Sequence, residues 1–237
     1  RMSFISYEIT ISVNPLATVN YDITSSTGRI SFELNENSNV VIEDLSLISS
    51  TGSIIVESDG AINTTIDDLT LTTSTGIIRF DFSEALNTSI QDLAFQCSTG
   101  DIKVDFGQYM SLNSSSISFI TSTGSIDLAY TGLIVYKDLD WIIQTNTGSI
   151  DLEISQDFYL PLNYTINFDV KTSTGSIDLA LDTESFLGVE ITATTSTGGI
   201  HIPGGLSHYE SPDYHLKDNQ YSFILTTSTG SIDASVY

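Results

Sequence analysis

A Thr-Gly dipeptide that returns at nearly constant intervals is the feature that most restricts the fold of this chain. Its glycine lies at positions 28, 52, 76, 100, 124, 148, 175, 198 and 230, and the first five intervals are 24 residues each. The best-formed units, at 122–128 and 173–179, read Ser-Thr-Gly-Ser-Ile-Asp-Leu. Such a period is typical of repeat architectures, in which one unit buries its apolar face only by stacking on its neighbours.

Apolar and polar residues alternate on both sides of each Thr-Gly. The second residue after the glycine is isoleucine in every unit: Ile30, Ile54, Ile78, Ile102, Ile126, Ile150, Ile177, Ile200 and Ile232. The fourth residue after the glycine, and the fifth and seventh before it, are also apolar. Alternation with period two predicts half-buried strands, so each unit is a strand, a Thr-Gly bend, a strand and a variable connection.

Two all-β architectures agree with this alternation. One is a β-solenoid (β-helix) of about nine coils with a 24-residue repeat and Thr-Gly at one corner. The other is a string of antiparallel hairpins with Thr-Gly loops. Tight hairpin loops require the first loop residue to adopt a positive φ, which a β-branched threonine resists. Turn chemistry therefore favours the solenoid.

The chain divides into an N-terminal strand at 1–19, which is a cap or a donor strand, and a solenoid domain at 20–237 with an insertion at 203–222. The polar start at Arg1 predicts a processed mature protein or a portion of one. Strict alternation marks the N-terminal strand, whose inward residues are Ile5, Tyr7, Ile9, Ile11 and Val13.

The last unit stops inside its own strand, which predicts an open edge at Ile232 and Val236. The N-terminal strand either completes its own first coil or adds to another subunit. A head-to-tail contact of the second kind does not close, so it gives a fibre. These residues are therefore the predicted assembly residues of a homopolymer.

Composition limits the possible partners. The chain carries 7 Lys+Arg against 30 Asp+Glu, a formal net charge of −23, which excludes ordinary electrostatic binding of nucleic acid. The chain has no run of about 18 apolar residues, so the sequence predicts no membrane insertion. Abundant Ser and Thr with few charged residues favours an extracellular, cell-surface location. The single cysteine, Cys97, is expected to be a small core residue.

Acidic residues recur in outward columns, three and five residues after the glycine. Like charges about 5 Å apart repel by about 1 kcal/mol per pair in water. Plain solvation, an acidic habitat or bridging Ca²⁺ would relieve this repulsion, and the candidate calcium ligands are Asp127, Asp151 and Asp178. No other cofactor is predicted.

Two further groups of residues are candidate sites. Four glycosylation sequons begin at Asn63, Asn87, Asn113 and Asn163, in the connections between units. Three histidines, His201, His208 and His215, lie in or beside the insertion with seven-residue spacing, which matches no zinc motif. The insertion is expected to be a solvated loop, and it is a candidate interaction surface.

The Ser-Thr-Gly-Ser-Ile-Asp-Leu units resemble the repeats of the adhesin domain family of bacterial and archaeal surface proteins, which centre on Ser-Gly-Asp-Ile. The resemblance covers about residues 20–237, although here the aspartate usually follows the isoleucine and precedes it only at Asp101-Ile102. It implies a right-handed β-helix at the cell surface, with no catalytic residues to transfer.

The favoured function is a structural subunit of an extracellular filament or cell-surface fibre. The alternatives are a non-polymerising adhesin that binds glycans or cells and, third, a polysaccharide-active β-helix enzyme. An enzyme is not expected, because acid–base work on a glycosidic bond requires two carboxyls with different environments in one cleft. The columns instead repeat from unit to unit, so no catalytic residue is predicted.

Overall fold

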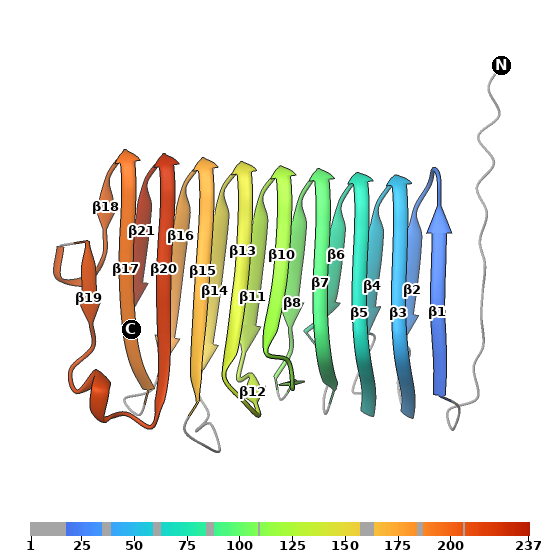
Figure 1. The fold of residues 1–237 in the computed structure, drawn as a ribbon, viewed down its shortest axis with the longest axis horizontal. Helices are drawn as coiled ribbons and strands as arrows, with labels where there is room; N and C mark the ends of the chain where they lie inside the picture. Colours follow the sequence, from blue (N-terminus) through green and yellow to red (C-terminus); the bar gives the residue numbers. More distant parts are fainter. Residues whose placement is uncertain are drawn as a thin grey trace.

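The computed structural model describes residues 18–34, 39–58, 63–83, 88–108, 110–156, 164–183, 187–205 and 207–237, with positions 39 and 63 described by their backbone alone. Within these ranges the chain is all-β and forms a β-solenoid of stacked parallel strands (Figure 1). The described helices are two short 3-10 turns, η1 (Pro203–Gly205) and η2 (Tyr214–Leu216). No described helix has the length and apolar content needed to cross a membrane.

The strands form two sheets that face each other across the core. Sheet 1 has, in spatial order, β1 (Thr18–Ser25), β3 (Asn39–Thr51), β5 (Asn63–Thr75), β7 (Ser89–Thr99), β10 (Ser116–Thr123), β13 (Leu139–Thr147), β15 (Thr165–Thr174), β20 (Asn219–Thr229), β17 (Leu187–Thr197) and β19 (His208–Glu210), with β9 (Ser111–Leu112) and β12 (Ile134–Val135) beside β7. Sheet 2 has β18 (Ile200–His201), β21 (Ile232–Val236), β16 (Ile177–Thr183), β14 (Ile150–Gln156), β11 (Ile126–Thr131), β8 (Ile102–Phe106), β6 (Ile78–Phe82), β4 (Ile54–Ser58) and β2 (Ile30–Leu34).

Neighbouring strands in a sheet come from different units and run parallel. Ile126 on β11, for example, pairs with Ile102 on β8 and with Ile150 on β14. The two strands of one unit belong to different sheets and are joined by the Thr-Gly bend. The predicted solenoid is therefore confirmed, and the hairpin alternative is wrong.

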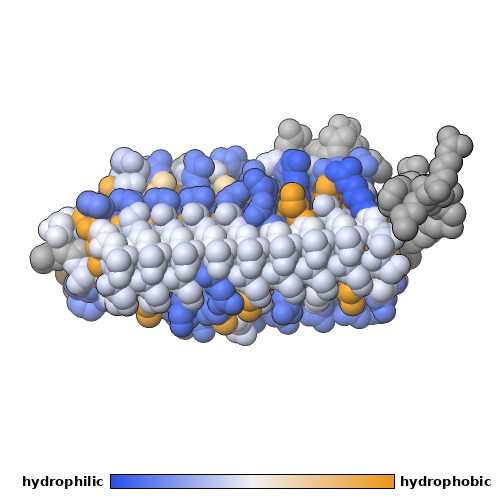
Figure 2. Space-filling view, turned by 90° about the horizontal axis from the view of Figure 1, so that it is seen from above, coloured by the Kyte–Doolittle hydropathy of each residue, from blue (hydrophilic) through white to orange (hydrophobic). Residues whose placement is uncertain are grey.

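The Thr-Gly bends stack along one edge of the solenoid, which Figure 2 shows from above as a continuous band of near-neutral hydropathy. Gly124 has a φ of +144°, and a Cβ on it would lie 2.1 Å from the carbonyl oxygen of Gly100 in the bend below. The next bend supports it, because the Thr145 hydroxyl donates to the Gly124 carbonyl oxygen at 2.9 Å. Glycine is thus required both for its positive φ and for the close approach of consecutive bends.

The core is one continuous stack of inward side chains. The isoleucine column after the bend is buried in nearly every unit. Aromatic rings fill the middle, where the Phe168 ring lies 5.4 Å from Trp141 and 4.4 Å from Phe223. The Cys97 thiol is buried as expected, and it donates to the Gly76 carbonyl oxygen at 3.3 Å. Each unit thus contributes the same layer, and its neighbours bury that layer.

The last coil, residues 219–237, does not lie at the end of the stack. Strand β20 lies between β15 and β17, and β21 lies between β16 and β18. In Figure 1 the red β20 separates the orange strands β15 and β17, which belong to consecutive coils of the chain. The expectation of an open edge is therefore wrong for Ile232, whereas residues 234–236 pair with β16 alone among the described strands. Ile232 is fully buried and pairs with Ile177 on one side and Ile200 on the other.

The insertion covers the end of the stack that β17 forms. Strand β19 pairs antiparallel with β17, with Tyr209 opposite Ile191. The Ser211 hydroxyl accepts a hydrogen bond from the Val189 amide at 2.9 Å, and the buried Tyr214 ring packs over Gly188. The insertion is therefore a cap over part of β17, while most of its described residues are exposed, as its polar sequence suggested. Its last residues belong to β20.

The opposite end is formed by β1 and β2. In the part of the chain that the structure describes, each of these strands pairs on one side only. Tyr21 and Phe32 stack edge to face at 5.3 Å and, with Val19 and Ile23, are only partly buried. The proposed N-terminal assembly residues, Ile5, Tyr7, Ile9, Ile11 and Val13, lie outside the described residues.

Candidate functional site

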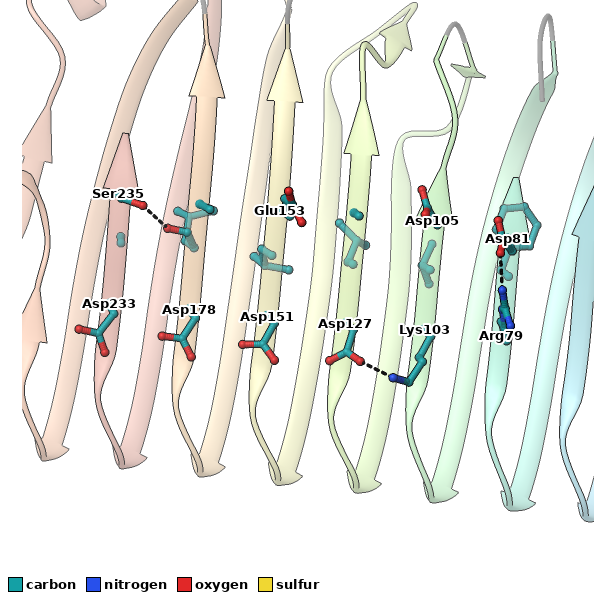
Figure 3. A pocket seen from close by; sticks show the side chains of 18 of the residues that line it. Arg79, Asp81, Lys103, Asp105, Asp127, Asp151, Glu153, Asp178, Asp233 and Ser235 are labelled. Atoms are coloured by element: carbon teal, nitrogen blue, oxygen red, sulfur yellow. Dashed lines mark hydrogen bonds and ion pairs between the residues drawn. The ribbon is translucent and has the colours of Figure 1, made fainter. Parts of the chain in front are cut away.

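The acidic column three residues after the glycine forms a straight row on the outer face of sheet 2 (Figure 3). Its parallel register pairs Asp127 with Asp151, Asp151 with Asp178, and Asp178 with Asp233 on successive strands. Successive inward isoleucines fix the parity of each strand, so every one of these carboxylates points outward. The structure thus brings the predicted calcium candidates Asp127, Asp151 and Asp178 together in one row.

A lysine and a histidine lie at the two ends of this row. Lys103 Nζ lies 2.9 Å from an Asp127 carboxylate oxygen, and His201 Nδ1 lies 3.0 Å from an Asp233 carboxylate oxygen. Asp151, in the middle, has aspartates on both sides. Partial burial raises the pKa of its carboxyl, and the charges of Asp178 and Asp127 raise it further.

The row five residues after the glycine runs beside the first. Burial raises the pKa of Asp105, and repulsion from Asp81 and Glu153 adds to this rise. Asp81 behaves in the opposite way. Its burial raises its pKa, but hydrogen bonds from Arg79, at 2.6 Å, and from Ser83 outweigh that effect and give a net lowering.

The two rows line a shallow groove of about 740 Å³ on the outer face of sheet 2, which extends from Arg79 to Ser235. Asp81 and Asp105, whose pKa values shift in opposite directions, pair on the adjacent strands β6 and β8. One strand spacing is about 5 Å, which is close to the separation of the two carboxyls in retaining glycosidases. The column continues to Glu57 on β4, so this pair lies in a row that repeats from strand to strand rather than in a cleft of its own.

Most strands contribute one carboxylate to the groove, and β14 contributes two, Asp151 and Glu153. Ca²⁺ takes six to eight oxygen ligands around one point. Among the described residues, no group of three or more His, Cys, Asp or Glu side chains could hold a metal ion. Asp127, Asp151 and Asp178 are therefore arranged as a ladder, and calcium stays a prediction that the geometry does not favour.

A second acidic row, which the sequence analysis missed, lies on the outer face of sheet 1. Asp44, Asp68 and Asp92 pair on β3, β5 and β7 and line a groove of about 630 Å³. Slight desolvation of the exposed Asp68 carboxyl, followed by the charge of Asp92, raises its pKa. Alignment of the units on the glycine would have found this row, because all three residues lie eight positions before it.

The structure describes the side chain of only one of the four predicted glycosylation asparagines. Asn113 is exposed. The Asn63 side chain, Asn87 and Asn163 lie outside the described residues, so the shared glycan edge stays a prediction.

The histidines belong to the capped end. His208 lies 4.0 Å from carboxylates of Glu190 and Glu210, and His215 Nε2 lies 3.7 Å from Glu210.

No protein-family model, no curated protein and no solved structure matches this chain. The resemblance to the adhesin domain family therefore stays a prediction, and the function must be inferred from the geometry.

Proposed function

We propose that this chain is the structural subunit of an extracellular, cell-surface fibre, a homopolymer in which copies join head to tail through strand addition. The observation that carries the proposal is the outermost coil. Within the described residues, β1 and β2 have no partner strand on their outer side, and Tyr21, Ile23 and Phe32 are only partly buried. An unpaired strand edge next to partly exposed apolar side chains is a template for another chain.

The acidic sides of the solenoid make contacts between two copies more favourable at the ends than along the sides. We infer nine coils with a 24-residue repeat, and nine strand spacings give a rod on the order of 40 Å long. Acidic rows cover the outer faces of both sheets, and the net charge is −23. Like-charged sides repel each other, which leaves the ends as the preferred surface for contact between copies.

Strand addition is favoured over simple stacking of one solenoid end on another. At the capped end, β19 already occupies the edge of β17 opposite Glu190–Thr192. A first coil that approached this end would meet the cap instead of a free backbone ladder.

Negative-stain microscopy of the purified protein tests the proposal, with two variants. Ile23→Lys places a charge on the outermost coil, where the side chain packs only partly against the core. Ile224→Lys is the matched control, because Ile224 is 53% exposed on an internal strand. We expect fibres from the native chain and from Ile224→Lys, and discrete particles from Ile23→Lys. Discrete particles from the native chain across pH and salt would reject the proposal.

A second candidate is a non-polymerising adhesin that binds glycans or cells. The groove on sheet 2 favours it, because paired carboxylates can accept hydrogen bonds from sugar hydroxyls along several strands. Glycan-array binding by a monomeric sample, lost in Asp151→Ala, would support this function. A polysaccharide-active enzyme has the weakest support, since Asp81 and Asp105 lie in a row of carboxylates that repeats from strand to strand rather than in a cleft of their own.

A further inference from the structure

The last coil occupies a slot between two coils that are consecutive in the sequence. One wall is β15 with β16, and the other is β17 with β18. The slot separates these walls by two strand spacings, or about 9.6 Å. The chain therefore passes from the first wall to the second, turns back through residues 203–218, and fills the space between them.

The two walls match each other as well as each matches the last coil. Thr227 pairs with Thr172 on one wall and Thr195 on the other, and Ile232 pairs with Ile177 and Ile200 in the same way. The walls can therefore pair directly when the last coil is absent. Direct pairing of the two walls would close the slot, so entry of the last coil is a separate step that competes with this closure.

Specific contacts hold the last coil in the slot once it has entered. Thr227 Oγ1 donates to the Gly175 carbonyl oxygen at 3.1 Å, and the Gly230 amide donates to the Thr197 carbonyl oxygen at 2.9 Å. The fully buried Tyr221 hydroxyl donates to Gln156 Oε1 at 3.2 Å. The first two contacts join the coil to its walls, and the third joins it to β14 behind the first wall. None of them depends on which chain supplies the coil.

We propose that the last coil, residues 219–237, is an exchangeable element, and that it can be donated to the slot of a second copy of this chain. A slot filled by its own chain and a slot filled by another copy differ only in the path of the connecting segment 203–218. Those 16 residues span up to about 50 Å when extended. Release breaks the ladders of the last coil to both walls, which the slot of the second copy restores, and it also requires β19 to leave β17, a pairing of three residues. Reciprocal exchange gives a closed dimer, and one-way exchange gives an open chain.

This exchange is separate from the contact at the outermost coil and does not depend on the fibre proposed above. It assigns Ile232 and Val236 to a donated coil rather than to an open end. Because donor and slot keep the same contacts in either arrangement, the balance depends on concentration.

Site-directed crosslinking of two tagged full-length chains, both in a Cys97→Ser background, tests the exchange. The donor carries Thr226→Cys and the acceptor carries Lys171→Cys, since these outward positions pair on adjacent strands. Each chain has one cysteine, so a disulfide between the two tags forms only when the donor coil enters the acceptor slot. Adjacent strands bring the two Cα atoms within disulfide range, about 4.4–6.8 Å.

The matched control acceptor is Gln144→Cys, which lies in the same row but one strand farther away. Its Cα would be about 9.6 Å from position 226, beyond disulfide range. Thr194→Cys, on the other wall, is a second acceptor in case Lys171→Cys does not fold.

After the two chains are refolded together and oxidised, we expect at least tenfold more mixed disulfide with Lys171→Cys or Thr194→Cys than with Gln144→Cys. The yield should increase with protein concentration and be unaffected by Ile23→Lys. A yield equal to the control for both acceptors, in samples whose circular dichroism shows the native fold, would overturn the exchange. Mixed disulfides without fibres would support the exchange and reject only the fibre.

Discussion

Substitution of alanine for Gly124 tests the stacking of the bends most directly. An alanine there must adopt the positive φ of +144°, and its Cβ would lie 2.1 Å from the Gly100 carbonyl oxygen. Gly28 is the matched control, because its φ is +108° but a Cβ on it would meet no atom within 4 Å. Both variants adopt an unfavourable backbone conformation, and only Gly124→Ala also forces two backbones apart.

The backbone conformation costs about 1–3 kcal/mol at either position. Displacement of a parallel ladder in the middle of the stack adds to that cost at Gly124. We therefore expect Gly124→Ala to lower the free energy of unfolding by more than about 4 kcal/mol, which is the range of exceptional substitutions. Gly28→Ala should lower it by the backbone cost alone, about 1–3 kcal/mol.

Urea unfolding followed by circular dichroism at about 218 nm measures both values. The m-value must stay constant for the comparison to hold, since a change would indicate that the end coil unfolds separately. Equal destabilisation by the two variants would refute the argument that contact between consecutive bends, rather than φ alone, requires glycine.

The remaining predictions concern the acidic rows, the hydroxyl ladder and the aromatic core. The folded-state pKa values of Asp68, Asp105 and Asp151 are raised, so the folded chain gains stability as pH falls from 7 through those values; the melting temperature should rise over this range, and less so in Asp151→Asn. Asp81, whose pKa is lowered, loses its stabilising effect only at more acidic pH, and a melting temperature that falls steadily from pH 7 would contradict this prediction. Thr145→Val removes the hydroxyl that donates to Gly124 and should cost about 1 kcal/mol in urea unfolding, whereas no loss would mean that water replaces it. Phe223→Ala leaves a cavity beside Phe168 and should cost about 3–5 kcal/mol; a cost below about 1 kcal/mol would mean that the last coil contributes little to the stability of the core.

The repeat predicts the individual coil well. The isoleucine after the bend is buried in nearly every unit and the polar residues beside it point outward, as the alternation predicts. These features are local, because a period of two and a Thr-Gly bend determine which side chains point inward wherever the unit is placed. The acidic row of Asp127, Asp151 and Asp178 follows from the same parity.

The order of the coils could not be predicted in this way. All units carry nearly the same columns, so a parallel ladder between any two of them has a similar energy, and sequence proximity alone suggests that Ile232 lies at an end. The length of the insertion is the available signal, since a long connection allows the chain to pass over one position and return. Its polar residues instead suggest a loop, because they do not reveal that Tyr209 and Tyr214 pack on β17.

The sequence by itself therefore determined the shape of one winding, its inward and outward faces and the requirement for glycine at the bend. Only the tertiary structure decided that the last coil lies between its two predecessors and that the insertion caps β17. The physical reason is that near-identical coils are interchangeable in a stack. Their order then depends on the lengths of the connections and on unique long-range contacts, such as the hydrogen bond from Tyr221 to Gln156.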